Sequence, residues 1–134
     1  MKILALDRLH ERHPGLTPSL GQSYVEAACV CFSRHHNPPV AVALKHSGGD
    51  ERRELDFTVP HARTRNAHAN DIDATEIGAY GVSLAAVEAV TGLVAVRRAE
   101  TLTGADWYVA PHDSDSYDLE RCLRLEVPFG TREE

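Results

Sequence analysis

Three acidic residues have the type and spacing of a metal site: Glu76 in "DATEIG", Asp106 in "TGADWY" and Glu126 in "RLEVP". Magnesium prefers oxygen ligands and often takes only one or two protein carboxylates, with water and a substrate phosphate completing its shell. An ion held there would activate water and neutralise the charge that develops on phosphate during phosphodiester hydrolysis. The acids therefore predict a Mg²⁺ pocket in which Asp106 and Glu126 bind the metal, supported by Glu76.

The same three acids also fit roles without chemistry. Strand alternation places Glu126 on the less apolar face of "RCLRLEV" and Asp106 opposite Trp107 and Val109. A less apolar face suits plain solvent exposure as well as it suits a site. Glu76, near the start of a predicted helix, would also interact favourably with the helix dipole. The spacing alone leaves both interpretations open.

The elements that would position these acids follow from local patterns. Thr17 and Pro18 are typical of an N-cap and first helical residue, and predict a helix that ends before the "NPP" at 37–39. Two extended runs around Gly48 and Gly49 predict a β-hairpin. The polar stretch 61–72 is expected to be a loop or a short exposed helix.

The second half of the chain carries the acids. A helix is predicted from Asp73 to Gly92, and its small and apolar residues indicate burial on several sides. Three strands follow in "LVAVRRAE", "ADWYVAP" and "RCLRLEV", and the polar link 112–120 is expected to be a surface loop. The order helix, strand, strand, helix, strand, strand, strand predicts an α/β chain of the α+β kind: a mixed, largely antiparallel sheet with two main helices.

A helix with Glu, a strand, a strand with "GxD" and a strand with "ExX" resembles the core of the PD-(D/E)xK, or restriction-endonuclease-like, nucleases over about residues 73–128. The resemblance implies that Asp106 and Glu126 bind the metal and that Glu76 is the assisting helix acid. One departure is chemical: Pro128 stands where the family has its catalytic lysine, and proline offers neither an amine nor a backbone donor.

Length and composition predict the domain organisation and the cellular location of the chain. With 134 residues, 43% of them hydrophobic and 25% charged, the chain is expected to form one globular domain over 1–134, with an N-terminal helix and hairpin in 1–60 and the nuclease-like part in 73–128. No apolar run is long enough to span a bilayer, and charges at 7 and 8 come too early for a signal peptide. We expect a cytoplasmic protein with reduced cysteines and no membrane association.

Charge bears on partners. The net charge of −6 disfavours a free-standing nucleic-acid binder, because phosphate contacts need clustered basic residues. Arg97 and Arg98 form one of the few basic clusters. A solvated surface is the favoured interpretation of such a pair, and contact with nucleic-acid phosphate is the alternative.

Two function classes remain. The first is a non-catalytic binding or assembly module with a degenerate restriction-endonuclease-like core, part of a larger complex as a homo-oligomer or with a partner protein that completes the fold. The alternative is a Mg²⁺-dependent nuclease that uses Glu76, Asp106 and Glu126. The missing lysine and the acidic charge favour the first.

Overall fold

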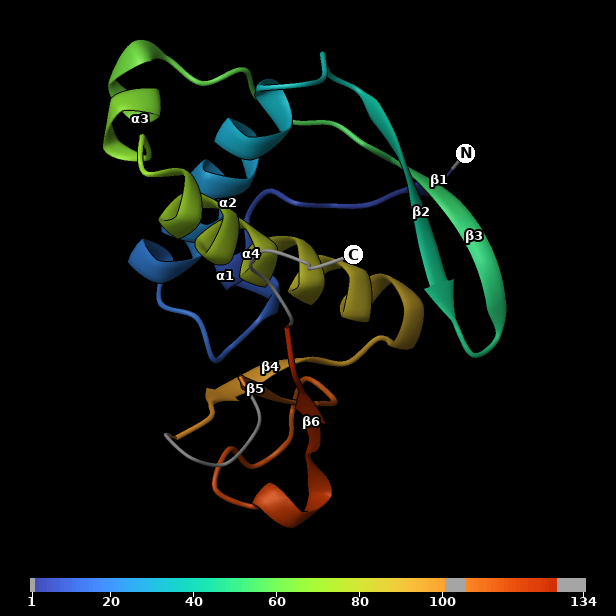
Figure 1. Ribbon diagram of the computed structural model, residues 1–134. Helices are drawn as coiled ribbons and strands as arrows, with labels where there is room; N and C mark the ends of the chain where they lie inside the picture. The colour runs from blue at the N-terminus through green and yellow to red at the C-terminus, as the bar shows by residue number, and fades with distance from the viewer. Residues whose placement is uncertain (1, 101–105, 128–134) are drawn as a thin grey trace.

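The computed structural model describes residues 2–100 and 106–127 (Figure 1). Helices and strands mix along the chain, which confirms the predicted α+β class. The elements run β1 (Lys2–Ile3), α1 (Leu9–Arg12), α2 (Pro18–Ser33), β2 (Val40–His46), β3 (Gly49–Leu55), α3 (Ala62–Ala67), α4 (Asp71–Thr91), β4 (Val94–Arg98), β5 (Trp107–Ala110), the 3₁₀ helix η1 (Leu119–Arg121) and β6 (Leu123–Leu125).

The described strands form two sheets, whereas the sequence predicts one. The first has the order β1-β3-β2, with β2 and β3 as the expected hairpin and β1 parallel to β3. The second has the order β4-β5-β6 and is antiparallel throughout. Figure 1 shows α2 and α4 between the hairpin and the second sheet. A strand pattern specifies which residues are extended but not which strands pair, so the division is invisible in the sequence.

The two long helices begin and end where capping chemistry sets them. Thr17 accepts a hydrogen bond from the Leu20 backbone N–H at the start of α2, as predicted. Helix α4 begins two residues earlier than predicted, because Asn70 caps it by accepting from the Asp73 N–H at 3.0 Å. It stops at Gly92, whose φ of 77° is the left-handed conformation that glycine adopts at little cost.

The earlier start of α4 changes the position of Glu76. The first turn contains Asp71 and Asp73, so these two residues, and not Glu76, lie where a carboxylate interacts best with the helix dipole. Glu76 lies beyond that turn, half-buried and one turn before Tyr80. The expectation that α4 is buried on several sides agrees with the structure, because every residue from Glu76 to Val90 is buried or half-buried. Its fully buried residues recur at helical spacing along the face toward the core.

Glycines let α2 and α4 approach closely. A Cβ added at Gly78 would lie 3.1 Å from the Ala28 Cα, and one at Gly81 would lie 3.2 Å from the Tyr24 Cβ. This approach brings Tyr24 of α2 and Tyr80 of α4 into a stacked pair with ring centroids 5.5 Å apart. The helix contact therefore sets the aromatic side chains that face the second sheet.

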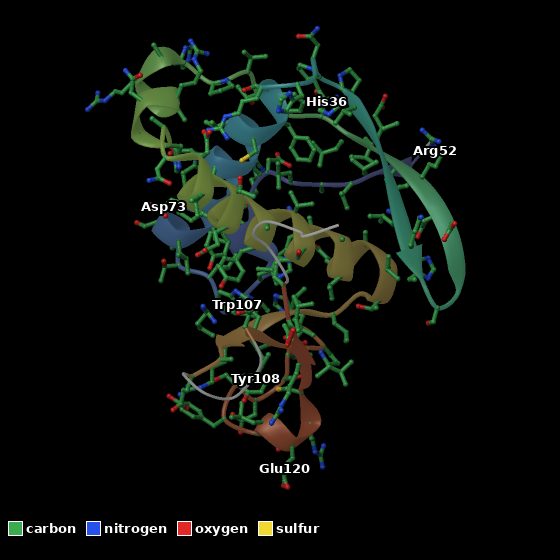
Figure 2. The ribbon with its side chains drawn as sticks, viewed as in Figure 1. His36, Arg52, Asp73, Trp107, Tyr108 and Glu120 are labelled. Atoms are coloured by element: carbon green, nitrogen blue, oxygen red, sulfur yellow. The ribbon has the colours of Figure 1, made fainter. Side chains whose placement is uncertain are left out.

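Two clusters of buried residues hold the elements together. The larger packs α2, α4 and both sheets around apolar side chains, among them Leu4, Leu9, Leu55, Leu84 and Trp107. The smaller lies on the other side of the second sheet, under the 111–122 segment, and contains Val96, Ala99, Tyr108 and Ala110. Figure 2 shows Trp107 and Tyr108 on opposite sides of β5, as strand alternation requires.

Three smaller expectations have clear outcomes. The polar stretch after Pro60 contains the short helix α3, which buries no residue. The three cysteines are unpaired, as expected. In the part of the chain that the structure describes, no helix combines the length and the apolar character needed to cross a bilayer.

We predict that Gly78→Ala lowers the free energy of unfolding. Alanine gains about 1 kcal/mol of helix propensity over glycine, but the added methyl meets the backbone of Ala28, which yields less readily than a side chain. Overpacking of this kind costs about 1–3 kcal/mol. Ser83→Ala on the same helix is the matched control, and urea unfolding measures both. A Gly78→Ala chain more stable than the wild type would contradict the close packing of α2 on α4.

Candidate functional site

The Asp106 backbone joins the strands of the second sheet. This residue lies in the bend before β5, outside regular strand geometry. Its N–H donates to the Leu125 carbonyl at 2.8 Å, which connects it to β6. Its own carbonyl accepts from the Ala99 N–H at 3.0 Å and from the Arg98 guanidinium, which connects it to β4. The backbone of Asp106 thus ties β5 to both neighbouring strands.

The Asp106 carboxylate is engaged as well. Oδ2 accepts from the Val127 backbone N–H at 2.6 Å, just beyond β6, and Oδ1 faces the Tyr80 hydroxyl at 3.4 Å. The first is a short, charge-assisted hydrogen bond, and the second is near the limit of hydrogen-bonding distance. Because the residue stands outside the strand, alternation along "ADWYV" does not decide where its side chain points.

Arg98 lies over an aromatic cluster made of Tyr24, Tyr80 and Trp107. Its guanidinium donates to the Tyr80 hydroxyl at 3.2 Å and lies 5.2 Å from the centroid of that ring and 5.9 Å from that of Trp107. Trp107 is fully buried and meets Tyr24 edge-on at 6.4 Å. A cation over such rings contributes about 0.5–1 kcal/mol when exposed and more when desolvated. Arg98 therefore helps to hold β4 against the helices.

Burial raises the pKa of the Tyr24 and Tyr80 hydroxyls, while the Arg98 guanidinium acts in the opposite direction on both. Asp106 adds to the rise at each hydroxyl, so both stay protonated and able to donate. The indole N–H of Trp107 also lowers the pKa of Tyr24, yet it makes no hydrogen bond of good geometry within the described residues. The aromatic cluster is thus uncharged, and the Arg98 guanidinium is the cation that lies over it.

The structure places one of the three predicted acids against Tyr80 and a second one helical turn away from it. Asp106 Oδ1 lies 3.4 Å from the Tyr80 hydroxyl, Glu76 comes one turn before Tyr80 on α4, and both acids raise the pKa of that hydroxyl. Glu126, in contrast, is exposed just after β6. Among the described residues, no group of three or more His, Cys, Asp and Glu side chains gathers closely enough to hold a metal ion. Coordination of Mg²⁺ by Asp106 and Glu126 stays a prediction, and Pro128 lies outside the described residues.

The two arginines proposed as nucleic-acid contacts both interact with protein groups. Arg97 lies 3.7 Å from the Glu100 carboxylate and 5.2 Å from the centroid of the Tyr117 ring. Arg98 is held by Tyr80 and the Asp106 carbonyl. A phosphate would have to compete with these partners, so the contacts favour structural roles for this pair.

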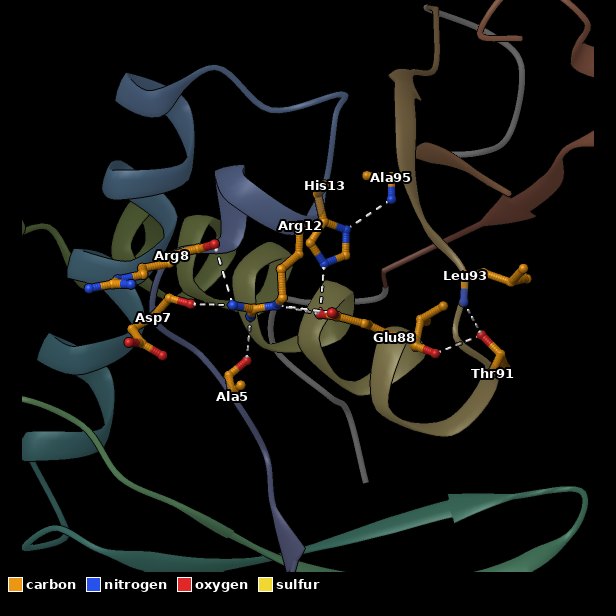
Figure 3. Close-up of polar contacts among 10 residues, drawn as sticks. Ala5, Asp7, Arg8, Arg12, His13, Glu88, Thr91, Leu93 and Ala95 are labelled. Carbon is orange, nitrogen blue, oxygen red and sulfur yellow. Dashed lines mark hydrogen bonds and ion pairs between the residues drawn. The ribbon is translucent and has the colours of Figure 1, made fainter. Parts of the chain in front are cut away.

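A polar cluster of buried His13 with half-buried Arg12 and Glu88 is not predicted by the sequence analysis (Figure 3). The Ala95 backbone N–H donates to His13 Nδ1 at 2.9 Å, so the ring proton is on Nε2, 3.1 Å from the Glu88 carboxylate. Arg12 Nε donates to both oxygens of that carboxylate, at 3.0 and 2.9 Å. The only signal was Glu88 itself, a lone charge inside the apolar run "AAVEAV".

A histidine paired with a carboxylate is also the arrangement of a general base. His13 is 0% exposed, however, and both of its ring nitrogens are occupied, so no substrate reaches it. Burial lowers its pKa, against the opposing effect of Glu88. The Arg12–Glu88–His13 cluster therefore fastens the N-terminal segment to α4 and β4.

Comparison with known proteins assigns the chain to no family. No family model matches the sequence, and neither the curated proteins nor the solved structures contain a significant match. Function is therefore argued from the contacts above.

We predict that Asp106→Ala lowers the free energy of unfolding by about 1–3 kcal/mol, because the buried Val127 N–H loses its acceptor. Asp106→Asn loses less, since an amide oxygen still accepts that bond. Glu126→Ala, at an exposed position, changes stability by no more than about 0.5 kcal/mol. Urea unfolding followed by fluorescence of the single tryptophan, Trp107, measures all three. Equal losses for Asp106→Ala and Glu126→Ala would contradict the structural role of Asp106.

His13 predicts a pH dependence of stability. Its pKa in the folded chain is below the ordinary value of 6.5, so below about pH 6.5 the unfolded chain takes up a proton that the folded chain does not. Stability from this group is fully present above pH 6.5 and falls as the pH drops, by at most about 1.4 kcal/mol per pH unit.

The measurement is urea unfolding between about pH 5 and 8. His13→Asn, which does not titrate, should lose this part of the slope. His61→Asn, at an exposed histidine, should keep it. A slope that is identical in the wild type and His13→Asn would overturn the assignment.

Proposed function

We propose that this chain is a non-catalytic binding or assembly module with a degenerate restriction-endonuclease-like core, and that it works in a larger complex as a homo-oligomer or with a partner protein. The observation that carries the proposal is the use of both Asp106 carboxylate oxygens inside the fold, by the Val127 N–H and the Tyr80 hydroxyl. Asp106, the main candidate metal ligand, thereby has a structural role in the fold.

The hydrogen bonds and charges around Asp106 support a non-catalytic role. A metal ligand must present lone pairs to the ion, and Oδ2 of Asp106 already holds a hydrogen bond of 2.6 Å, so coordination would compete with closure of the β5–β6 edge. The Arg98 guanidinium is bonded to the Asp106 backbone carbonyl and to the Tyr80 hydroxyl, which itself lies 3.4 Å from Oδ1 of the Asp106 carboxylate. A divalent cation entering there would be repelled by the guanidinium.

The second candidate is a Mg²⁺-dependent nuclease that uses Glu76, Asp106 and Glu126. The observation that favours it is that Asp106 contacts the Tyr80 hydroxyl while Glu76 comes one helical turn before Tyr80 on α4. The family resemblance implies a helix acid and an acid at the start of a strand on the same side of the sheet. Glu126 follows β6, the strand that pairs with β5.

The test is a cleavage assay on the purified chain with Mg²⁺ or Mn²⁺ and single- and double-stranded DNA and RNA. We expect no cleavage, and no heat of metal binding by calorimetry. Asp106→Asn and Glu126→Gln are the matched variants, because each removes a charge while it keeps the shape of the side chain. Cleavage by the wild type that both variants lose would overturn the non-catalytic proposal and establish the nuclease.

A further inference from the structure

The β2 strand forms an open edge of the first sheet. Within the described residues the order β1-β3-β2 gives β2 a partner on one side only, and the strand is seven residues long, Val40–His46. It has no proline and no acidic residue, and Lys45 is its single full charge. A long edge strand of this composition is a template for pairing with another chain.

The other sheet edges are protected or very short. The outer edge of β4 is closed at Ala95, whose carbonyl accepts from the Gly15 N–H at 2.8 Å and whose N–H donates to His13. The edge strands β1 and β6 contain two and three residues. Of the edges that the structure describes, β2 is thus the one that offers a long ladder.

The hairpin register fixes which β2 groups point outward. His46 and Gly49 flank a two-residue turn and pair directly, so they exchange both of their backbone hydrogen bonds. Because bonded and non-bonded pairs alternate, the backbone groups of Val40, Val42, Leu44 and His46 point toward β3. Those of Ala41, Ala43 and Lys45 point to the open edge.

We propose that this edge pairs antiparallel with β2 of a second copy of the chain, about a twofold axis at Ala43. The inference rests on the proposed assembly function and names its surface and partner. Ala43 would face the second copy's Ala43, and Ala41 would face the second copy's Lys45. All three residues have outward backbone groups, so each opposed pair exchanges two hydrogen bonds. The two hairpin sheets become one continuous sheet.

The side chains suit this register. On the inner face, half-buried Val42 meets the second copy's Leu44, which extends an apolar row that already packs on the core. On the outer face Ala41 and Ala43 are small and exposed, so nothing obstructs the approach. Arg52, directly opposite Ala43, points away from the helices (Figure 2).

Charge selects a second copy as the occupant. Glu54 is the cross-strand partner of Ala41, so in the paired sheet Lys45 reaches over the second copy's Ala41 toward the second copy's Glu54. Two strand spacings separate these backbones by about 10 Å, which a lysine and a glutamate together span. Lys45 faces Asp50 within its own hairpin, and in the dimer each Lys45 gains a second anion from the other copy.

Sedimentation velocity over a wide range of concentrations tests the proposal. The wild type is expected to form a dimer of twice the 14.7 kDa chain mass. Ala43→Pro should raise the dimer dissociation constant at least about tenfold, because the ring removes the outward N–H at the twofold axis. The β2–β3 ladder does not use that N–H, so thermal stability should stay near that of the wild type. Ala43→Val keeps the N–H and is the matched control, which should dimerise.

A charge exchange tests the register separately. Lys45→Glu should weaken the dimer, because it sets two acids side by side across the interface, and the double variant Lys45→Glu/Glu54→Lys should restore it. A wild type that stays monomeric, or a dimer indifferent to both Ala43→Pro and Lys45→Glu, would overturn this inference. A monomeric chain without nuclease activity would contradict only the β2–β2 dimer. Nucleic-acid cleavage that depends on Asp106 would contradict the proposed non-catalytic assembly function, on which the dimer rests.

Discussion

The close approach of α2 and α4 is the constraint on which the rest of the structure depends. Gly78 and Gly81 carry no side chain, so at these two positions the backbone of α4 lies directly against Ala28 and Tyr24 of α2. The stacked pair of Tyr24 and Tyr80 follows from that spacing, and the second sheet packs on this pair through Trp107. A bulkier residue at either glycine would separate the rings and move the hydroxyl that Asp106 and Arg98 share.

A second constraint is the Arg12–Glu88–His13 cluster, whose directional hydrogen bonds orient the N-terminal segment more strictly than apolar packing alone would. Glu88 comes from α4, Arg12 and His13 from the N-terminal segment, and Ala95 from β4, and each polar group in the chain of contacts has a partner. Buried polar groups are costly without partners and strongly directional with them. The Arg12–Glu88–His13 cluster therefore sets how the N-terminal segment crosses α4, which a purely apolar contact of similar area would leave free to slide.

The parts of the fold that could be predicted are those that local chemistry decides. Thr17 and Gly92 mark helix ends through capping, and the Gly48-Gly49 pair marks the hairpin, so these elements lie close to where the sequence places them. The division into two sheets and the meeting of His13 with Glu88 depend on residues far apart in the chain, and no periodicity encodes them. For the candidate site, the sequence identifies which residues are acidic. The role of each acid depends on the residues that lie around it in space, which the sequence does not specify. Asp106 shows this best, because the bend before β5 frees its side chain from strand alternation.

The environment of Asp106 shows how a half-buried carboxylate can be stabilised by groups of the chain itself. A carboxylate in a half-buried position needs positive charge or N–H donors nearby. Here the Val127 N–H donates to the carboxylate, and the Arg98 guanidinium, which lies over the Tyr80 ring, donates to the backbone carbonyl of the same residue. Both are covalent parts of the chain, so the arrangement forms whenever the chain folds and depends on no ion concentration. These contacts join the end of β4, the start of β5 and the residue after β6, and through Tyr80 they connect the second sheet to α4.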